Sequence, residues 1–173
     1  MAVHSAGVML YRFNAGILEV LLVHPGGPFW ARKDDGAWSI PKGLVEGSED
    51  VLSAAKREFT EETGFAIDGD FLDLGSLTQP SKKIVTAFAL HRDVDAAQAV
   101  SNTFTLEWPP KSGRIVSCPE IDRAEWFPLP KAREKIAKGQ REFISRLAAL
   151  LHISDKEEIV NYSAENAQLS LFD

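Results

Sequence analysis

Hydrophobic residues in the first part of the chain form two short β-branched runs, which predict a β-hairpin. The runs cover residues 6–13 and 17–23, and Asn14, Ala15 and Gly16 lie between them. Two such runs joined by a short turn that contains glycine favour antiparallel strands. The same kind of pattern predicts further strands at residues 71–77, 83–91, 104–108 and 124–127.

A helix is predicted in the middle of the chain. Ser48 is the expected N-cap, and Glu49 and Asp50 after it would place negative charge at the positive end of the helix dipole. The helix should end at Thr63, where Gly64 fits a left-handed C-cap. The residues expected to pack this helix on a sheet are Leu52, Ala55 and Phe59.

The pattern becomes helical again from Pro130 onward. After Gly139 an apolar stripe recurs at helical spacing, formed by Phe143, Ile144, Leu147, Leu150 and Leu151. Residues 161–173 are mostly polar and are expected to form a mobile tail. We therefore expect one folded domain over residues 1–152 and a partly flexible extension over residues 153–173.

Length and composition are those of one ordinary soluble domain. The chain has 173 residues, of which 45% are hydrophobic, and 19 basic against 25 acidic residues give a net charge of -6. This charge excludes bulk nucleic-acid binding, since no overall positive field exists. The single cysteine, Cys118, cannot form an intramolecular disulfide and is expected to be a buried structural residue. The chain shows neither a signal peptide nor the roughly 18 apolar residues of a membrane span, so we expect a cytoplasmic protein without membrane contact.

Three carboxylates share one face of the predicted middle helix. Glu58, Glu61 and Glu62 have the spacing i, i+3 and i+4, so they would project within an arc of roughly 100°. Their mutual repulsion favours a divalent cation, and the lack of neighbouring His or Cys favours Mg²⁺ or Mn²⁺ over zinc. The alternative is a solvated helix surface on which Lys56 and Arg57 pair with the glutamates.

The residues around these carboxylates fit a longer motif in the segment GLVEGSEDVLSAAKREFTEETGF, residues 43–65. Its fixed positions, in order, are Gly43, Glu49, Arg57, Glu58, Phe59, Glu61, Glu62, Gly64 and Phe65. They match every fixed position of the Nudix box, so the chain resembles the Nudix hydrolases. The resemblance implies the α/β class, with an α/β/α sandwich around a mixed β-sheet. The box would form a loop, a helix and a loop in that fold.

The same resemblance implies a metal site. Glu58, Glu61 and Glu62 would be the metal-binding carboxylates, with the carbonyl of Gly43 as an additional ligand. Mg²⁺ would be the cofactor, with Mn²⁺ as the alternative. Arg57 would brace the loop and the helix together with Glu49.

Hydrolysis of a pyrophosphate bond by water is the activity that this resemblance implies. Divalent ions would neutralise the bridging oxygens and activate the water, and a carboxylate would take its proton. Branches of the family differ in the residue that acts as general base. Glu58 within the box and Glu120 downstream are both candidates here.

Residues outside the box indicate a nucleotide substrate. Lys42 makes the entry Pro-Lys-Gly, which is similar to that of the asymmetric diadenosine tetraphosphate hydrolases and would contact phosphate. Phe29 and Trp30 are candidate surfaces for stacking a base, whereas Trp38 is expected in the core. The remaining candidates for phosphate contact are Lys82 and Lys83, which otherwise form an ordinary basic start of a strand.

Several substrates therefore stay open. A dinucleoside polyphosphate comes first and a nucleoside triphosphate second, although the tyrosine that usually follows the box in the dinucleoside branch is absent. The chain's two tyrosines are Tyr11 and Tyr162. Pro80, placed after Phe65 as in ADP-ribose pyrophosphatases, keeps ADP-ribose as an alternative. A non-catalytic Nudix-fold nucleotide sensor is the alternative from another class.

The C-terminal end carries a second resemblance. It is similar to the bacterial sliding-clamp-binding pentapeptide, in the residues Gln168, Leu169, Ser170, Leu171 and Phe172. The alternative is that these apolar side chains dock on the protein's own surface. A homodimer is also expected, since dimers are common among Nudix hydrolases.

Overall fold

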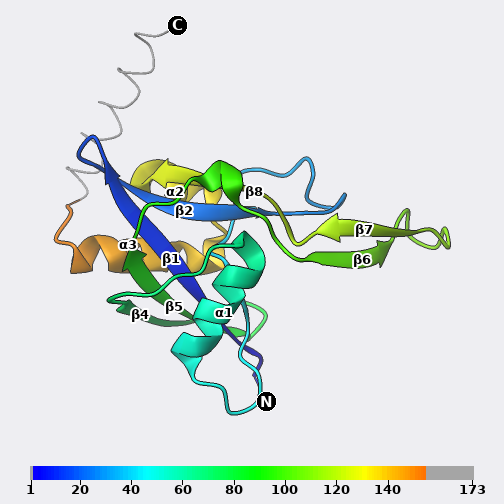
Figure 1. The fold of residues 1–173 in the computed structure, drawn as a ribbon, viewed down its shortest axis with the longest axis horizontal. Helices are drawn as coiled ribbons and strands as arrows, with labels where there is room; N and C mark the ends of the chain where they lie inside the picture. Colours follow the sequence, from blue (N-terminus) through cyan, green and yellow to red (C-terminus); the bar gives the residue numbers. More distant parts are fainter. Residues whose placement is uncertain (1, 155–173) are drawn as a thin grey trace, which may run out of the picture.

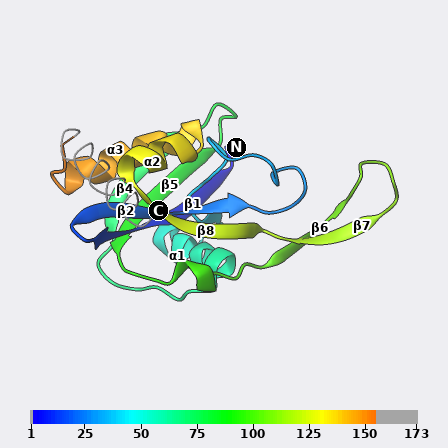
Figure 2. The same ribbon diagram turned by 90° about the horizontal axis from the view of Figure 1, so that it is seen from above.

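A computed structural model describes residues 2–154, which form an α/β/α sandwich around a mixed six-stranded sheet (Figures 1 and 2). The order along the sheet is β4-β5-β1-β2-β8, and β3 pairs with β1 outside this path. β1 runs parallel to β5, and the other pairs of this sheet are antiparallel. The predicted fold class is confirmed. The strands of this sheet are β1 (His4–Asn14), β2 (Ile17–Pro25), β3 (Lys42–Leu44), β4 (Leu72–Thr78), β5 (Ile84–His91) and β8 (Ile121–Pro128).

Helices cover both faces of the sheet, as Figure 2 shows with the sheet seen nearly edge-on. On one side lies α1 (Val51–Thr63), and on the other lie α2 (Leu129–Lys135) and α3 (Arg141–Leu150). Two short 3-10 helices are Ala96–Gln98 and Lys138–Gln140. Each face has its own apolar core, so the sheet is buried on both sides, which suits its long apolar strands.

The helical faces differ in part from the predictions. Ala55 and Phe59 of α1 are buried as expected, but Ala54 completes the buried face and Leu52 is only half-buried. In α3 the predicted apolar stripe holds for Phe143, Ile144 and Leu147, while Leu150 is 48% exposed. Leu151, also predicted in the stripe, is partly buried against the core, so Leu150 is the position of the stripe that faces outward.

The start of α1 corrects another prediction. The N-cap is Asp50 instead of Ser48, because a carboxylate oxygen of Asp50 accepts a hydrogen bond from the backbone N of Ser53 at 3.1 Å. Glu49 is therefore outside the helix and free to bind elsewhere. The C-cap is Gly64 with φ of 79°, as predicted.

β1 and β2 diverge at one end, and the fork between them holds residues 39–44. β1 pairs with β2 over residues 11–14 and with β3 over residues 5–7, so the two long strands separate toward the start of β1. Residues 39–44 enter the fork, where the backbone N of Val8 donates to the carbonyl of Pro41 at 3.2 Å. These residues thereby hold β3 next to α1.

The strands β6 (Thr103–Glu107) and β7 (Ile115–Pro119) form a separate two-stranded sheet. We call residues 103–119 the arm, because in both views it extends away from the body of the molecule (Figures 1 and 2). The sequence predicted the first strand of the arm but not its partner, since IVSCP is short and ends in proline. The single cysteine, Cys118, is buried at the base of the arm, as expected.

The predicted tail lies outside the described residues, and so does the clamp-binding pentapeptide from Gln168 to Phe172. Both stay predictions, as do the homodimer and the division at residue 152. Within residues 2–154, no helix has the length and hydrophobicity required to cross a membrane.

Candidate active site

A cavity of about 520 Å³ brings together most of the residues that the sequence singled out. It is bounded by the end of β2 and the loop after it (residues 25–30), by β3, by the polar side of α1 and by the base of the arm. Glu58 and Glu62 of α1 line it, and so does Glu120, which lies between β7 and β8. Glu46, in the loop before α1, also lines it, so segments far apart in the sequence present four glutamates to one cavity.

The carboxylate of Glu58 lies directly on the backbone of Gly43. A Cβ added at Gly43 would collide with the carboxylate, and the three heavy atoms nearest to that Cβ all belong to Glu58. Glycine is thus required at this position by the space that Glu58 occupies. The contact joins β3 to α1 and exposes the backbone of Gly43 to the carboxylate cavity.

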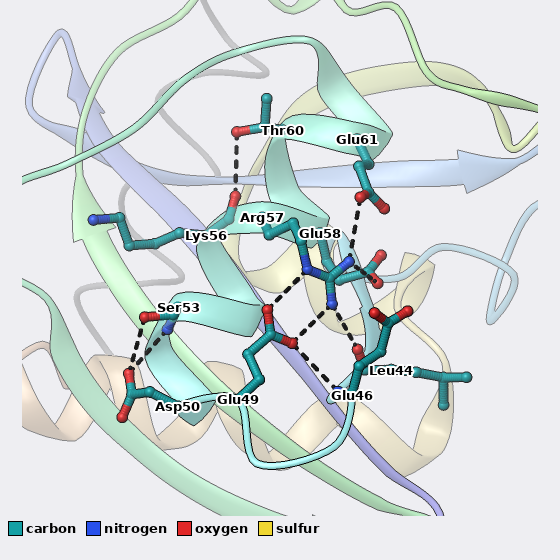
Figure 3. A network of polar contacts seen from close by, with 10 residues as sticks. All are labelled: Leu44, Glu46, Glu49, Asp50, Ser53, Lys56, Arg57, Glu58, Thr60 and Glu61. Carbon is teal, nitrogen blue, oxygen red and sulfur yellow. Dashed lines mark hydrogen bonds and ion pairs between the residues drawn. The ribbon is translucent and has the colours of Figure 1, made fainter.

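Arg57 links the loop before α1 to the carboxylates on the helix (Figure 3). Its guanidinium binds both oxygens of Glu49, at 2.9 and 3.0 Å, and donates to the carbonyl of Leu44 at 3.0 Å. One nitrogen also contacts Glu58 at 2.9 Å and Glu61 at 3.2 Å. These carboxylates, Glu49 first, raise the pKa of Arg57 above its usual value. Arg57 therefore has the contacts of a brace between loop and helix.

Glu62 is the most strongly perturbed carboxylate of the site. Its pKa is raised to about 8, chiefly by burial and to a lesser extent by the nearby Glu120 and Glu58, while the backbone hydrogen bond and the charge of Lys42 act in the opposite direction. That backbone N lies 3.1 Å from Glu62 Oε2. Burial likewise raises the pKa of Glu58, with Arg57 acting in the opposite direction. A site that collects buried negative charge has the electrostatics of a cation site.

Glu120 is held by its backbone beside the other two carboxylates. Its carbonyl accepts a hydrogen bond from the N of Gly26 at 3.0 Å, and its N donates to the carbonyl of Asn102 at 2.8 Å. Asn102 in turn donates from its N to the carbonyl of Glu61 at 2.9 Å. The base of the arm is thereby connected both to the loop after β2 and to α1.

The donor set of the cavity fits a hard divalent cation. Glu46, Glu58, Glu62 and Glu120 offer carboxylate oxygens, Gly43 is the backbone position beside them, and the cavity lining contains neither His nor Cys. Among residues 2–154, no three His, Cys, Asp or Glu side chains are grouped closely enough to enclose a metal ion. Glu61 explains part of this, because it is paired with Arg57 and does not line the cavity.

The alternative prediction, a solvated helix surface on which Lys56 and Arg57 pair with the glutamates, agrees with the structure only in part. Arg57 does pair with glutamates, but Lys56 instead contacts Asp68 at 3.1 Å, on another side of the helix. The two cations therefore leave Glu62 without an ion pair within the described residues.

The aromatic candidates lie in the loop after β2 but differ in exposure. Phe29 is 59% exposed and Trp30 is half-buried against the core. The ammonium of Lys33 makes cation–π contacts with both rings, at 3.8 Å from the centre of Phe29 and 5.0 Å from that of Trp30. Trp38 is buried in the core, as expected.

The basic candidates separate into two groups. Lys42 lines the carboxylate cavity and also a second cavity of about 390 Å³, which the turn between β4 and β5 lines as well. Lys83 lines that second cavity, whereas the adjacent Lys82 does not. No carboxylate lines this second cavity, so it is the cationic side of the site.

The cavity residues that the sequence analysis missed include Glu46, Phe104 and Leu106. Phe104 and Leu106 belong to the first strand of the arm, which was predicted as a strand without any role. The available signal was the alternation of apolar and polar residues in TFTLE, although alternation cannot indicate which cavity a face will line.

Comparison with known proteins adds a family and a fold. The model of the NUDIX domain matches residues 1–147 of this chain. The protein "Nudix hydrolase 7" of Arabidopsis thaliana is 26% identical over 163 residues, which are 94% of this chain and 52% of that protein. The chain thus spans about half the length of this relative.

Two solved structures have a similar fold. The NUDIX domain of Shewanella oneidensis NrtR, complexed with ADP ribose, gives a TM-score of 0.60 at 15% identity, covering 87% of this chain and 89% of that one. A binary complex of C. elegans Ap4A hydrolase gives a TM-score of 0.59 at 23% identity, covering 86% and 98%. Both likenesses concern the fold alone.

Proposed function

The chain belongs to the Nudix family, and from this premise we propose that it hydrolyses a pyrophosphate bond in a nucleoside diphosphate linked to another moiety. The observation that carries the proposal is the gathering of Glu58, Glu62 and Glu120 around one cavity that also contains Lys42. The carboxylates can hold a divalent cation and the lysine can bind phosphate, so the cavity suits a phosphate substrate that binds together with a cation. Mg²⁺ is the proposed cofactor, with Mn²⁺ as the alternative.

Each residue of the site would have a separate role in this reaction. A divalent cation held by Glu58, Glu62 and the carbonyl of Gly43 would supply positive charge that offsets the charge of the phosphate oxygens. Arg57 keeps Glu58 in place through the 2.9 Å contact and ties it to the loop before α1. Glu61 would act through the same arginine, or as a further ligand if it turned away from it.

Glu58 and Glu120 remain the two candidates for the general base. Each lines the cavity, so each is within reach of a water molecule beside a bound phosphate. Glu58 is constrained by Arg57 and Gly43, whereas the side chain of Glu120 makes no hydrogen bond or ion pair to a residue within the described range 2–154. This difference favours Glu120 as the residue that takes the proton.

The arrangement of lysines supports a dinucleoside polyphosphate as the first substrate to test. Lys42 lines both cavities, and Lys83 lines the second one, so a phosphate chain that passes Lys42 would meet further positive charge at Lys83. A dinucleoside polyphosphate or a nucleoside triphosphate has such a chain, whereas ADP-ribose has only two phosphates. The similar fold of C. elegans Ap4A hydrolase agrees with this order, and that of the NrtR domain keeps ADP-ribose in the comparison.

One observation favours the second candidate function, a nucleotide sensor without catalysis. Glu61 is paired with Arg57 at 3.2 Å and lies outside the cavity lining, which leaves fewer carboxylates to hold a cation. A sensor would bind nucleotide in the same cavity and release it unchanged.

A hydrolysis panel distinguishes these functions. The purified chain would be incubated with Mg²⁺ and a dinucleoside tetraphosphate, canonical or oxidised nucleoside triphosphates, or ADP-ribose, and the products identified by mass. Glu62→Gln is the control, since it replaces the carboxylate by a neutral amide of nearly the same shape. Turnover of one substrate class that is lost in this variant supports the enzyme, and binding without turnover supports the sensor.

A further inference from the structure

The arm has one apolar face, and this face lies toward the active-site cavity. The cross-strand pairs Phe104–Cys118 and Leu106–Val116 place these four side chains on the same side of the hairpin. Phe104, Leu106 and Val116 are half-buried and Cys118 is buried, whereas residues 103, 105, 107, 115 and 117 on the other side are exposed. Of the apolar face, Phe104 and Leu106 line the cavity that contains Glu58 and Glu62.

The position of Phe104 relative to the carboxylates is fixed by the base of the arm. Asn102 donates from its N to the carbonyl of Glu61 at 2.9 Å, and the N of Gly26 donates to the carbonyl of Glu120 at 3.0 Å. Phe104 is therefore two residues from a position that is hydrogen-bonded to α1. The projecting hairpin could move at its tip, but its base is tied on both sides of the cavity.

Gly26 and Gly27 allow the loop after β2 to approach the arm closely. A Cβ at Gly26 would collide with the carbonyl of Pro119, and a Cβ at Gly27 would lie 3.2 Å from Cζ of Phe104. Gly27 also has φ of 93°, a conformation that favours glycine. The ring of Phe104 thus lies against the loop after β2 and forms part of the cavity wall.

Phe104 is better placed to receive a planar ring than the aromatic residues of the loop after β2. The ammonium of Lys33 lies over Phe29 at 3.8 Å and near Trp30 at 5.0 Å, and the two rings also contact each other edge to face. Within the described residues, the ring of Phe104 has no cation over it and no aromatic partner. Leu106, on the same face of β6, lines the cavity with it.

We infer that Phe104, supported by Leu106, binds the base of the nucleotide substrate and thereby selects nucleotides over diphosphate compounds that lack a base. The inference rests on the proposed function and deepens it, because it names the part of the substrate that contacts the arm. The base would stack on the ring of Phe104 while its phosphates extend toward Lys42 and the carboxylates. Stacking on an aromatic side chain accepts any base with a π-face, so the arm favours nucleotides over other diphosphate compounds.

The test compares Phe104→Ala with Ile115→Ala. Ile115 is on the opposite, outer face of the same hairpin and is 65% exposed, so its variant controls for general effects on the arm. For Phe104→Ala we expect KM for the substrate found in the panel to rise about tenfold or more, with little change in kcat. Phe104→Trp keeps a stacking surface and should restore KM, while Ile115→Ala should match the wild type.

A substrate analogue with hydrogen in place of each base separates base binding from phosphate binding. Phe104→Ala should leave KM for this analogue unchanged, because the lost contact is with the base. An equal effect on the analogue and on the nucleotide, or an equal effect of Ile115→Ala, overturns the inference.

Equilibrium binding keeps this inference distinct from the proposed hydrolysis. Calorimetry with Mg²⁺ and a non-hydrolysable dinucleoside polyphosphate analogue should show the same loss of about tenfold or more for Phe104→Ala, whether or not the chain has activity. If wild type binds without turnover and the variant loses binding, the hydrolase proposal fails and the role of Phe104 stands. If the two proteins bind equally, the role of Phe104 fails.

Discussion

At the scale of single residues, the contact of Glu58 with Gly43 connects two elements that would otherwise be independent. β3 is three residues long and α1 begins seven residues after it. Arg57 adds a second connection by binding the carbonyl of Leu44 and the side chain of Glu49. A short strand is thereby held against the helix through polar groups, and the carboxylates remain at the edge of the cavity.

Gly43→Ala is predicted to destabilise the protein through its contact with Glu58. The added Cβ forces the carboxylate away, and overpacking of this kind costs about 1–3 kcal/mol in the free energy of unfolding. In the background of Glu58→Ala the three nearest atoms are absent, so the same substitution should cost much less. Urea denaturation of the four proteins of this double-mutant cycle measures the difference. Equal costs in both backgrounds would show that the collision is with the rest of the loop.

The sequence located part of this site because helical spacing is regular. Glu58 and Glu62 are one turn apart, so a helix alone places them on one face, and the box identified Gly43 and Arg57 with them. Phe104 lies more than forty residues later in the chain. Its approach to Glu58 depends on hydrogen bonds between distant backbones at the base of the arm, and no local pattern encodes these.

At the scale of elements, the predictions succeeded where length and periodicity were clear. The long strands β1 and β2 and the C-terminal end of α1 lie where the sequence placed them. β3 was missed because three residues carry no measurable alternation, and it is a strand only because β1 pairs with it. The predicted N-cap was two residues too early, because Ser48 and Asp50 are both good N-cap residues. Arg57 favours Asp50, since it binds Glu49 outside the helix.

Substitution of the N-cap tests this assignment. Asp50→Ala removes the acceptor of the 3.1 Å hydrogen bond from Ser53, so the free energy of unfolding should fall by about 1 kcal/mol. Ser48→Ala is the matched control, because Ser48 is exposed and precedes the cap, and it should change stability by less than about 0.5 kcal/mol. Thermal or chemical denaturation gives both values. If Ser48→Ala proved the more costly of the two, the helix would begin earlier in solution.

At the scale of the whole molecule, the body and the arm are stabilised in different ways. The body has an apolar core on each face of its sheet, and neither core includes a residue from 104 to 118. The arm is a separate two-stranded sheet, and isolated hairpins are marginally stable in water. Its attachment through Asn102 and Glu120 therefore matters more for its position than for the stability of the body.

Shortening the arm should separate substrate selection from folding. Thr103 and Pro119 are cross-strand partners, so residues 104–118 can be replaced by Gly-Gly without moving Asn102 or Glu120. The melting temperature should change by only a few degrees, because the layers of the body remain intact. KM for the nucleotide should rise at least as much as in Phe104→Ala, since the whole apolar wall is gone. Turnover of the analogue without bases should persist, because Glu58, Glu62 and Glu120 stay in place; its loss in a folded protein would mean that the arm positions the carboxylates themselves.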